Sequence, residues 1–203
     1  MKLFLKIPLF LSFLLIYSIS FTQTNKEVDS LENLLNRTVS DSVKAKIMNR
    51  LFGKLDEADS QKALNYAQQA LSIAEKNNLR TELSNSLANL GLYYDTRSEY
   101  PQAINYYSKA LKVNIAAADT PRVIHSYSNL GFVYSIQGDY VSALDVFFKA
   151  LNYAEKSNYI PSLPGLYNNI GELNRLQKNA ATAEEFFLKA VKISEESGNK
   201  KVM

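Results

Sequence analysis

The chain has 203 residues, 46% of them hydrophobic, which is enough for one sizeable core or one short repeat array. Two of its 23 basic residues, Lys2 and Lys6, lie within residues 1–22, so the remainder carries 21 basic against 20 acidic side chains and gives no indication of a nucleic-acid partner. Cysteine is absent, which excludes disulfides, thiolate catalysis and cysteine-ligated metal sites.

Residues 1–22 have the layout of a secretory signal peptide: two lysines, an uncharged apolar run over 7–21, and small residues in "SISFTQ". The run is shorter than the roughly 20 residues that span a bilayer comfortably. We therefore expect an exported protein, periplasmic or secreted, with an uncleaved signal anchor as the alternative. No second hydrophobic segment follows, so no membrane contact beyond the signal peptide is expected.

The next segment, 23–40, is predicted to form an N-terminal capping helix. Val28, Leu31, Leu34 and Leu35 recur there at helical spacing, and Leu31 is in register with Leu71 of the array that follows. Residues 81–120, 121–160 and 161–200 then align without a gap, and 41–80 aligns more weakly. Residues 201–203 would begin a further repeat.

Each forty-residue block contains two helical patterns separated by turn signals such as "IQGDY". The chain is therefore predicted to be all-α, built of antiparallel helical hairpins. Glycine recurs in the first helix, and alanine in the second, where we expect the two to meet closely because neither carries side-chain bulk. Large residues of the second helix, Tyr107, Phe147 and Phe187, are expected to fill the groove beside them. Thr120 and Pro121 are expected to cap and begin the first helix of their block. The recurring small residues are Gly91, Gly131, Gly171, Ala103, Ala143 and Ala183.

These columns resemble the tetratricopeptide repeat family. The third block matches best, with Tyr127, Leu130, Gly131, Tyr134, Gly138, Tyr140, Ala143, Phe147 and Ala150 in the family's pattern. The resemblance implies a right-handed superhelical solenoid that binds peptides or proteins. The period of 40 exceeds the family's usual 34, which resembles the long-helix subgroup that includes kinesin light chain. Leu51 replaces the glycine in the first block, and Asn174 replaces the tyrosine in the last.

An asparagine stands two residues before each glycine, about 200° around the helix axis from it. First helices line the inner surface of such a stack, so these residues are predicted to form a ladder along it. An amide both donates and accepts, which suits the backbone of an extended peptide. The alternative is that they bond to a neighbouring hairpin or loop. The four are Asn49, Asn89, Asn129 and Asn169.

Other positions predicted to face the same groove would supply selectivity. The set mixes apolar and polar side chains and lacks the lysines and arginines that clamp a terminal carboxylate. Plain packing between repeats is the alternative for its aromatic members. These candidates are Phe132, Glu172, Asp95, Ser135, Arg175 and His125.

No phosphate-binding loop, nucleophile elbow or paired-histidine metal spacing occurs, so neither catalysis, a metal nor a cofactor is expected. His125 is the only histidine and has no partner motif. The predicted function is an exported scaffold that binds a peptide or protein segment in its groove. The alternative is the extracytoplasmic input module of a larger signalling protein, such as a histidine kinase, cyclase or transcriptional regulator, that continues beyond residue 203.

Overall fold

The computed structural model describes residues 26–55 and 59–199, and the proposed signal peptide and residues 201–203 lie outside this part. The described residues contain helices and no strand, so the all-α prediction is confirmed. Residues 26–37 are helical, and the short 3-10 helix η1 spans Ile160–Ser162. The α-helices that follow are α2 (Asp41–Leu55), α3 (Ser60–Lys76), α4 (Arg80–Asp95), α5 (Tyr100–Ala116), α6 (Thr120–Ile136), α7 (Tyr140–Lys156), α8 (Leu163–Leu176) and α9 (Ala180–Asn199).

The chain divides into two compact units, residues 1–82 and 83–203. In the first unit, Leu35 of the helix over 26–37 packs against a core formed by α2 and α3. Glu32 of the same helix accepts hydrogen bonds from Lys62, at 2.7 Å, and from the Tyr66 hydroxyl, at 3.0 Å. Apolar packing and these polar contacts together fix the helix over 26–37 onto α3.

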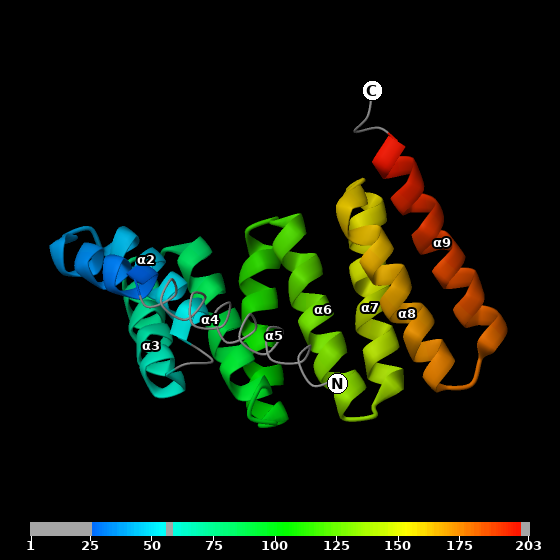
Figure 1. Ribbon diagram of the computed structural model, residues 1–203, viewed down its shortest axis with the longest axis horizontal. Helices are drawn as coiled ribbons and strands as arrows, with labels where there is room; N and C mark the ends of the chain where they lie inside the picture. The colour runs from blue at the N-terminus through cyan, green and yellow to red at the C-terminus, as the bar shows by residue number, and fades with distance from the viewer. Residues whose placement is uncertain (1–25, 56–58, 200–203) are drawn as a thin grey trace, which may run out of the picture. The chain divides into compact units, whose positions relative to one another are not determined.

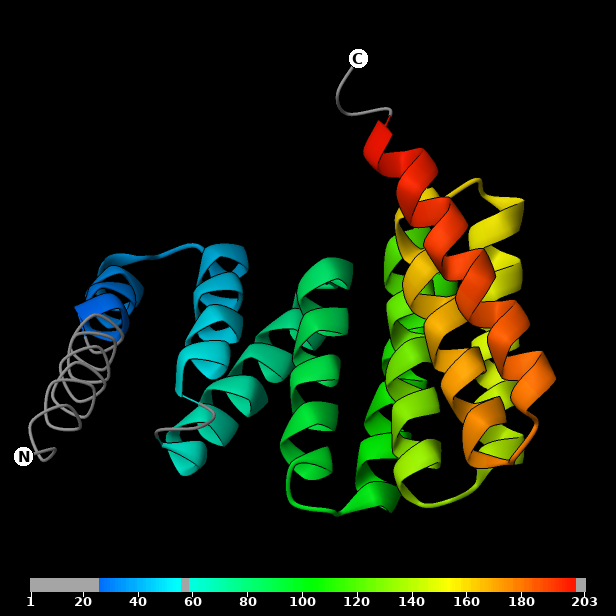
Figure 2. The same cartoon turned by 45° about the vertical axis from the view of Figure 1, so that its right-hand side comes forward.

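In the second unit, α6 pairs with α7 and α8 pairs with α9 as antiparallel hairpins (Figures 1 and 2). The core between them is built from buried side chains of α7 and α8, including Phe147, Leu166 and Ile170. A second cluster joins Ala103 and Tyr107 of α5 to the next hairpin. Each hairpin therefore buries an apolar stripe against the one before it, as repeat proteins do.

The repeated glycines lie against the aromatic rings predicted to fill the groove beside them. A methyl group on Gly131 would lie 2.6 Å from the Phe147 ring, and one on Gly91 would lie 2.5 Å from the Tyr107 ring. At Gly171 such a methyl would lie 2.8 Å from the Phe187 ring and 3.2 Å from the Ala183 carbonyl. Because glycine has no side chain, the aromatic ring packs directly on the helix backbone. Each glycine and its aromatic residue, which follows the recurring alanine by four positions, therefore form one packing unit.

The turns between helices repeat every 20 residues, twice as often as the sequence pattern. One residue in each turn has a left-handed backbone with φ between 52° and 76°. At the second of these turns, Ser98 N–H bonds to the Asp95 carbonyl and Glu99 N–H bonds to the Tyr94 carbonyl, which closes the end of α4. The left-handed residues are Asn78, Ser98, Ala118, Gly138, Asn158 and Lys178.

The start of α6 differs from the prediction by one residue. Asp119 is the N-cap, and its side chain accepts a hydrogen bond from the Arg122 N–H. Thr120 and Pro121 are therefore the first two helical residues. Proline is well tolerated there because its position has no intrahelical N–H partner to lose.

Candidate functional site

The asparagine column occupies two different environments. In the first unit, the half-buried Asn49 amide donates to the Glu82 carbonyl at 3.2 Å and to the Glu82 carboxylate at 3.1 Å. Glu82 is itself almost fully buried. Asn49 therefore links α2 to Glu82, the last residue of the first unit. These bonds support the alternative, structural role for this residue.

The side chains of Asn129 on α6 and Asn169 on α8 are half-buried, yet they form no hydrogen bond with any residue of 26–55 or 59–199. Asn49 bonds to Glu82, which lies 33 residues after it. The positions equivalent to Glu82 in the next two repeats are Arg122 and Ser162. Ser162 donates instead to the Tyr159 carbonyl at 3.1 Å. The equivalent partner of Asn129 is thus lost. Asn89 is half-buried and has polar contacts of its own.

Apolar side chains lie exposed near these amides along the first helix of each hairpin. Phe132, 48% exposed, stands one turn after the asparagine on α6, and its ring meets the Phe147 ring edge-on at 5.6 Å between centroids. Contact with a buried ring holds the Phe132 ring in place. The others are Leu92 at 39%, Ile136 at 61% and Leu176 at 41%. We define the first-helix face as Leu92, Asp95, Asn129, Phe132, Ser135, Ile136, Asn169, Glu172, Arg175 and Leu176.

Two predicted charged residues of this face neutralise each other. The Arg175 guanidinium donates to both carboxylate oxygens of Glu172, at 2.8 Å and 2.6 Å. This bidentate pair lowers the pKa of Glu172 and raises that of Arg175. Both side chains lie about half exposed, so the pair contributes little stability. Its effect is to leave neither charge free for a ligand.

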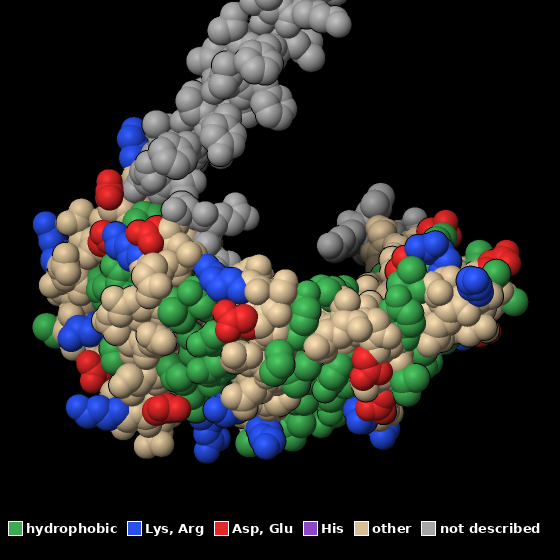
Figure 3. Space-filling model, turned by 90° about the horizontal axis from the view of Figure 1, so that it is seen from below, with side chains coloured by type: hydrophobic (Ala, Val, Ile, Leu, Met, Phe, Trp, Pro, Cys, Tyr) green, Lys and Arg blue, Asp and Glu red, His purple; other side chains and the backbone are tan. Residues whose placement is uncertain are grey.

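The remaining predicted residues differ in exposure. His125 is exposed on α6, and Ser135 is half-buried. Asp95 ends α4 half-buried, and burial raises the pKa of its carboxyl. On the surface shown in Figure 3, acidic and basic side chains are scattered among apolar ones rather than gathered into a patch of one sign.

The described residues offer no site for conventional metal chemistry. No group of three or more histidine, aspartate or glutamate side chains is placed to hold a metal ion within 26–55 and 59–199. Over the same residues, no helix is both long enough and apolar enough to cross a membrane.

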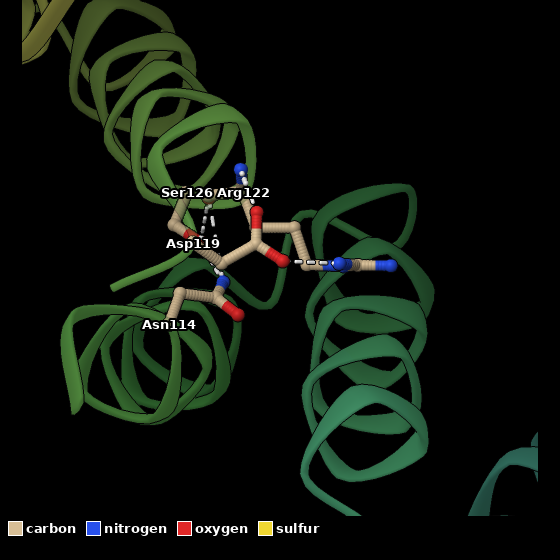
Figure 4. A network of polar contacts seen from close by, with 4 residues as sticks. All are labelled: Asn114, Asp119, Arg122 and Ser126. Carbon is tan, nitrogen blue, oxygen red and sulfur yellow. Dashed lines mark hydrogen bonds and ion pairs between the residues drawn. The ribbon is translucent and has the colours of Figure 1, made fainter. Parts of the chain in front are cut away.

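One polar network was not predicted, and it joins α5 to α6 (Figure 4). The buried Asn114 amide donates to the Ser126 hydroxyl at 2.9 Å and to the Arg122 carbonyl at 3.3 Å. Ser126 donates to the same carbonyl at 2.9 Å. A signal existed in the sequence: the equivalent positions in the next block are Ala154 and Leu166, so both positions change from polar to apolar together there.

Solved structures with the same arrangement cover nearly all of this chain. Aspartyl phosphate phosphatase F from Bacillus subtilis aligns at 22% identity and TM-score 0.78, over 91% of this chain and 52% of its own. BtubC from P. vanneervenii aligns at 20% identity and TM-score 0.76, over 87% of this chain and 75% of its own. A signal transduction ATPase with a tetratricopeptide repeat sensor, from Pyrococcus horikoshii, aligns at 19% identity and TM-score 0.78, over 92% of this chain and 29% of its own. The chain thus spans about half of the first protein, and the likenesses show the fold.

Family models agree with the repeat pattern. No curated protein matches the chain. A tetratricopeptide repeat model matches residues 54–116 and 82–156, which together exceed half of the chain, and a second such model matches 164–197. With its glycine-seated aromatics and repeated hairpins, the chain belongs to the tetratricopeptide repeat family.

Proposed function

We propose that this protein is an interaction scaffold that binds an extended peptide segment of a partner protein across the first-helix face. The observation that carries this proposal is the pair of half-buried amides of Asn129 and Asn169, which have no hydrogen-bond partner within the described ranges. Each amide can donate to a peptide C=O and accept from a peptide N–H. A ligand that covers these amides without pairing with them would pay for two buried, unpaired groups. A peptide whose backbone pairs with them avoids this cost.

The apolar members of the face would supply the rest of the affinity. Burying roughly half of an exposed phenylalanine or leucine side chain is worth about 1 kcal/mol. Phe132 is held by the Phe147 ring, so a ligand that packs on it orders little additional side chain. The amides contact any backbone, whereas the apolar positions discriminate between ligand side chains.

The fold supports a protein-interaction scaffold. A Rap protein in complex with competence and sporulation factor aligns at 18% identity and TM-score 0.67, over 90% of this chain and 53% of its own. A ligand-bound protein with this fold is consistent with our proposal, and the residues that carry it are those of this chain.

The proposal can be tested without knowing the natural ligand. The immobilised protein is used to select peptides from a random display library, and the selected peptides are measured by fluorescence anisotropy. Replacing Asn129 and Asn169 together by alanine is expected to weaken these peptides at least tenfold, because two backbone hydrogen bonds of about 1 kcal/mol each are lost. The melting temperature is expected to stay unchanged, because neither amide bonds to the described protein.

Two variants control this experiment. Replacing the exposed Asn105 and Asn152 of the second helices by alanine should leave peptide binding unchanged. Replacing Asn49 by alanine should lower the melting temperature, because it removes two hydrogen bonds to the buried Glu82. Undiminished binding after loss of Asn129 and Asn169 would refute their assignment as ligand contacts.

The scaffold is also proposed to act outside the cytoplasm, on the strength of the leader-like composition of residues 1–22. N-terminal sequencing of the protein from an envelope or culture fraction tests this proposal. Recovery of intact Met1 from the cytoplasm would contradict it. A sensor module is a second candidate function, favoured by the match to a repeat sensor of a signal transduction ATPase.

A further inference from the structure

The first-helix face carries one acidic group that the described protein does not neutralise. Asp95 is the last residue of α4, and its side chain is half-buried. Its carboxylate has no ion pair or hydrogen bond with any residue of 26–55 or 59–199. Burial alone accounts for the raised pKa of this carboxyl. The group has therefore lost water without gaining a cation.

Three other charged residues on or beside this face are already paired. Glu172 and Arg175 form their bidentate pair on α8. Arg122 of α6 is bonded to the Asp119 carboxylate at the helix N-terminus. Arg97, two residues after Asp95, donates instead to the Tyr93 carbonyl at 2.8 Å and lies over the Tyr93 ring at 3.5 Å. Asp95 is thus an acidic group of this face without an ion pair among the described residues, and the charge complementary to it is positive.

We propose that Asp95 selects peptides that carry a lysine or arginine a short distance from an apolar residue seated on Phe132. This inference rests on the proposed function, and it adds the chemical class of the ligand. A cation that reaches a partly desolvated carboxylate forms a charge-assisted hydrogen bond, which is stronger than a neutral one. The neighbouring apolar surface suits the methylene stem of either basic side chain.

Asp95 and Phe132 lie on the first helices of successive hairpins, α4 and α6. A ligand that contacts both side chains must therefore run across the first helices and not along one of them. Ser135, at the position of Asp95 on the next helix, carries no charge to compete for the cation.

The peptide selection described above tests this inference with the complete chain and an Asp95→Asn variant. Peptides selected by the unaltered protein are expected to be enriched in sequences that carry a lysine or arginine together with an apolar residue. A selected basic peptide should bind Asp95→Asn on the order of tenfold more weakly. The same peptide with glutamine in place of its basic residue should bind both proteins equally.

An Asp145→Asn variant is the matched control, because Asp145 lies exposed on α7 and pairs with Lys149 at 2.6 Å. It should retain the preference for basic peptides. If the selected peptides lack a basic residue, or if Asp95→Asn keeps the preference for basic peptides, the proposed role of Asp95 is wrong. The proposed function, binding of a peptide, would survive either result. Failure to select any peptide would instead overturn the proposed function, and the inference with it.

Discussion

Replacing Ala118 by glycine should stabilise the protein. Ala118 lies in the turn between α5 and α6 with φ of 53°, a left-handed conformation that costs an L-residue about 1–2 kcal/mol. Glycine removes that cost but adds about 0.5–1 kcal/mol of unfolded-chain entropy. The net gain is about 0.5–1 kcal/mol, or roughly 1–4 °C in melting temperature for a chain of this size.

The preceding residue provides a matched control. Ala117 is also exposed, but its φ is −88°, in the region that alanine favours. Ala117→Gly should therefore give no stabilisation, and Gly138→Ala, at the equivalent left-handed turn position, should destabilise the protein. Urea unfolding followed by circular dichroism measures all three variants. Equal shifts for Ala117→Gly and Ala118→Gly would refute the backbone explanation.

Two further predictions concern packing. Gly131→Ala should destabilise by about 1–2 kcal/mol, since its methyl would overlap the Phe147 ring, whereas Gly165→Ala, with open space at its Cβ, should be neutral or stabilising in calorimetry. Asn114→Ala and Ser126→Leu should each cost about 1–3 kcal/mol in chemical denaturation, yet together cost far less, because Ala154 and Leu166 already form this pair one repeat later. Additive losses would contradict the idea that the pair is exchangeable as a unit.

The helical hairpins were predictable from the sequence because each repeat solves the same packing problem. Gly131 and Phe147 recur with their equivalents at one fixed spacing, so their shared role in packing the two helices was visible in the sequence. The 20-residue repeat of the turns was not predictable. The left-handed positions hold asparagine, serine, alanine, glycine and lysine, because only the backbone conformation is repeated there.

The asparagine column shows why the site was harder to predict than the fold. Asn49 and Asn129 occupy the same position in their repeats and are the same residue, yet one is bonded and the other is open. The difference arises 33 residues later, where Glu82 bonds Asn49 and Ser162 turns to the Tyr159 carbonyl. A position in one repeat thus acquires its role from a residue in the next, which a comparison of single columns does not detect.

The same reasoning separates the positions that build the repeat from those that recognise a ligand. Positions that pack against the neighbouring hairpin meet nearly the same surroundings each time, so small and aromatic residues recur in them. Positions on the first-helix face meet solvent, and they change from Leu92 to Phe132 to Glu172, and from Asp95 to Ser135 to Arg175. Asn129 and Asn169 combine both behaviours, because their identity repeats although no described residue uses their amides. We therefore propose that these two amides pair with a ligand that is itself repetitive, and the peptide backbone is such a ligand.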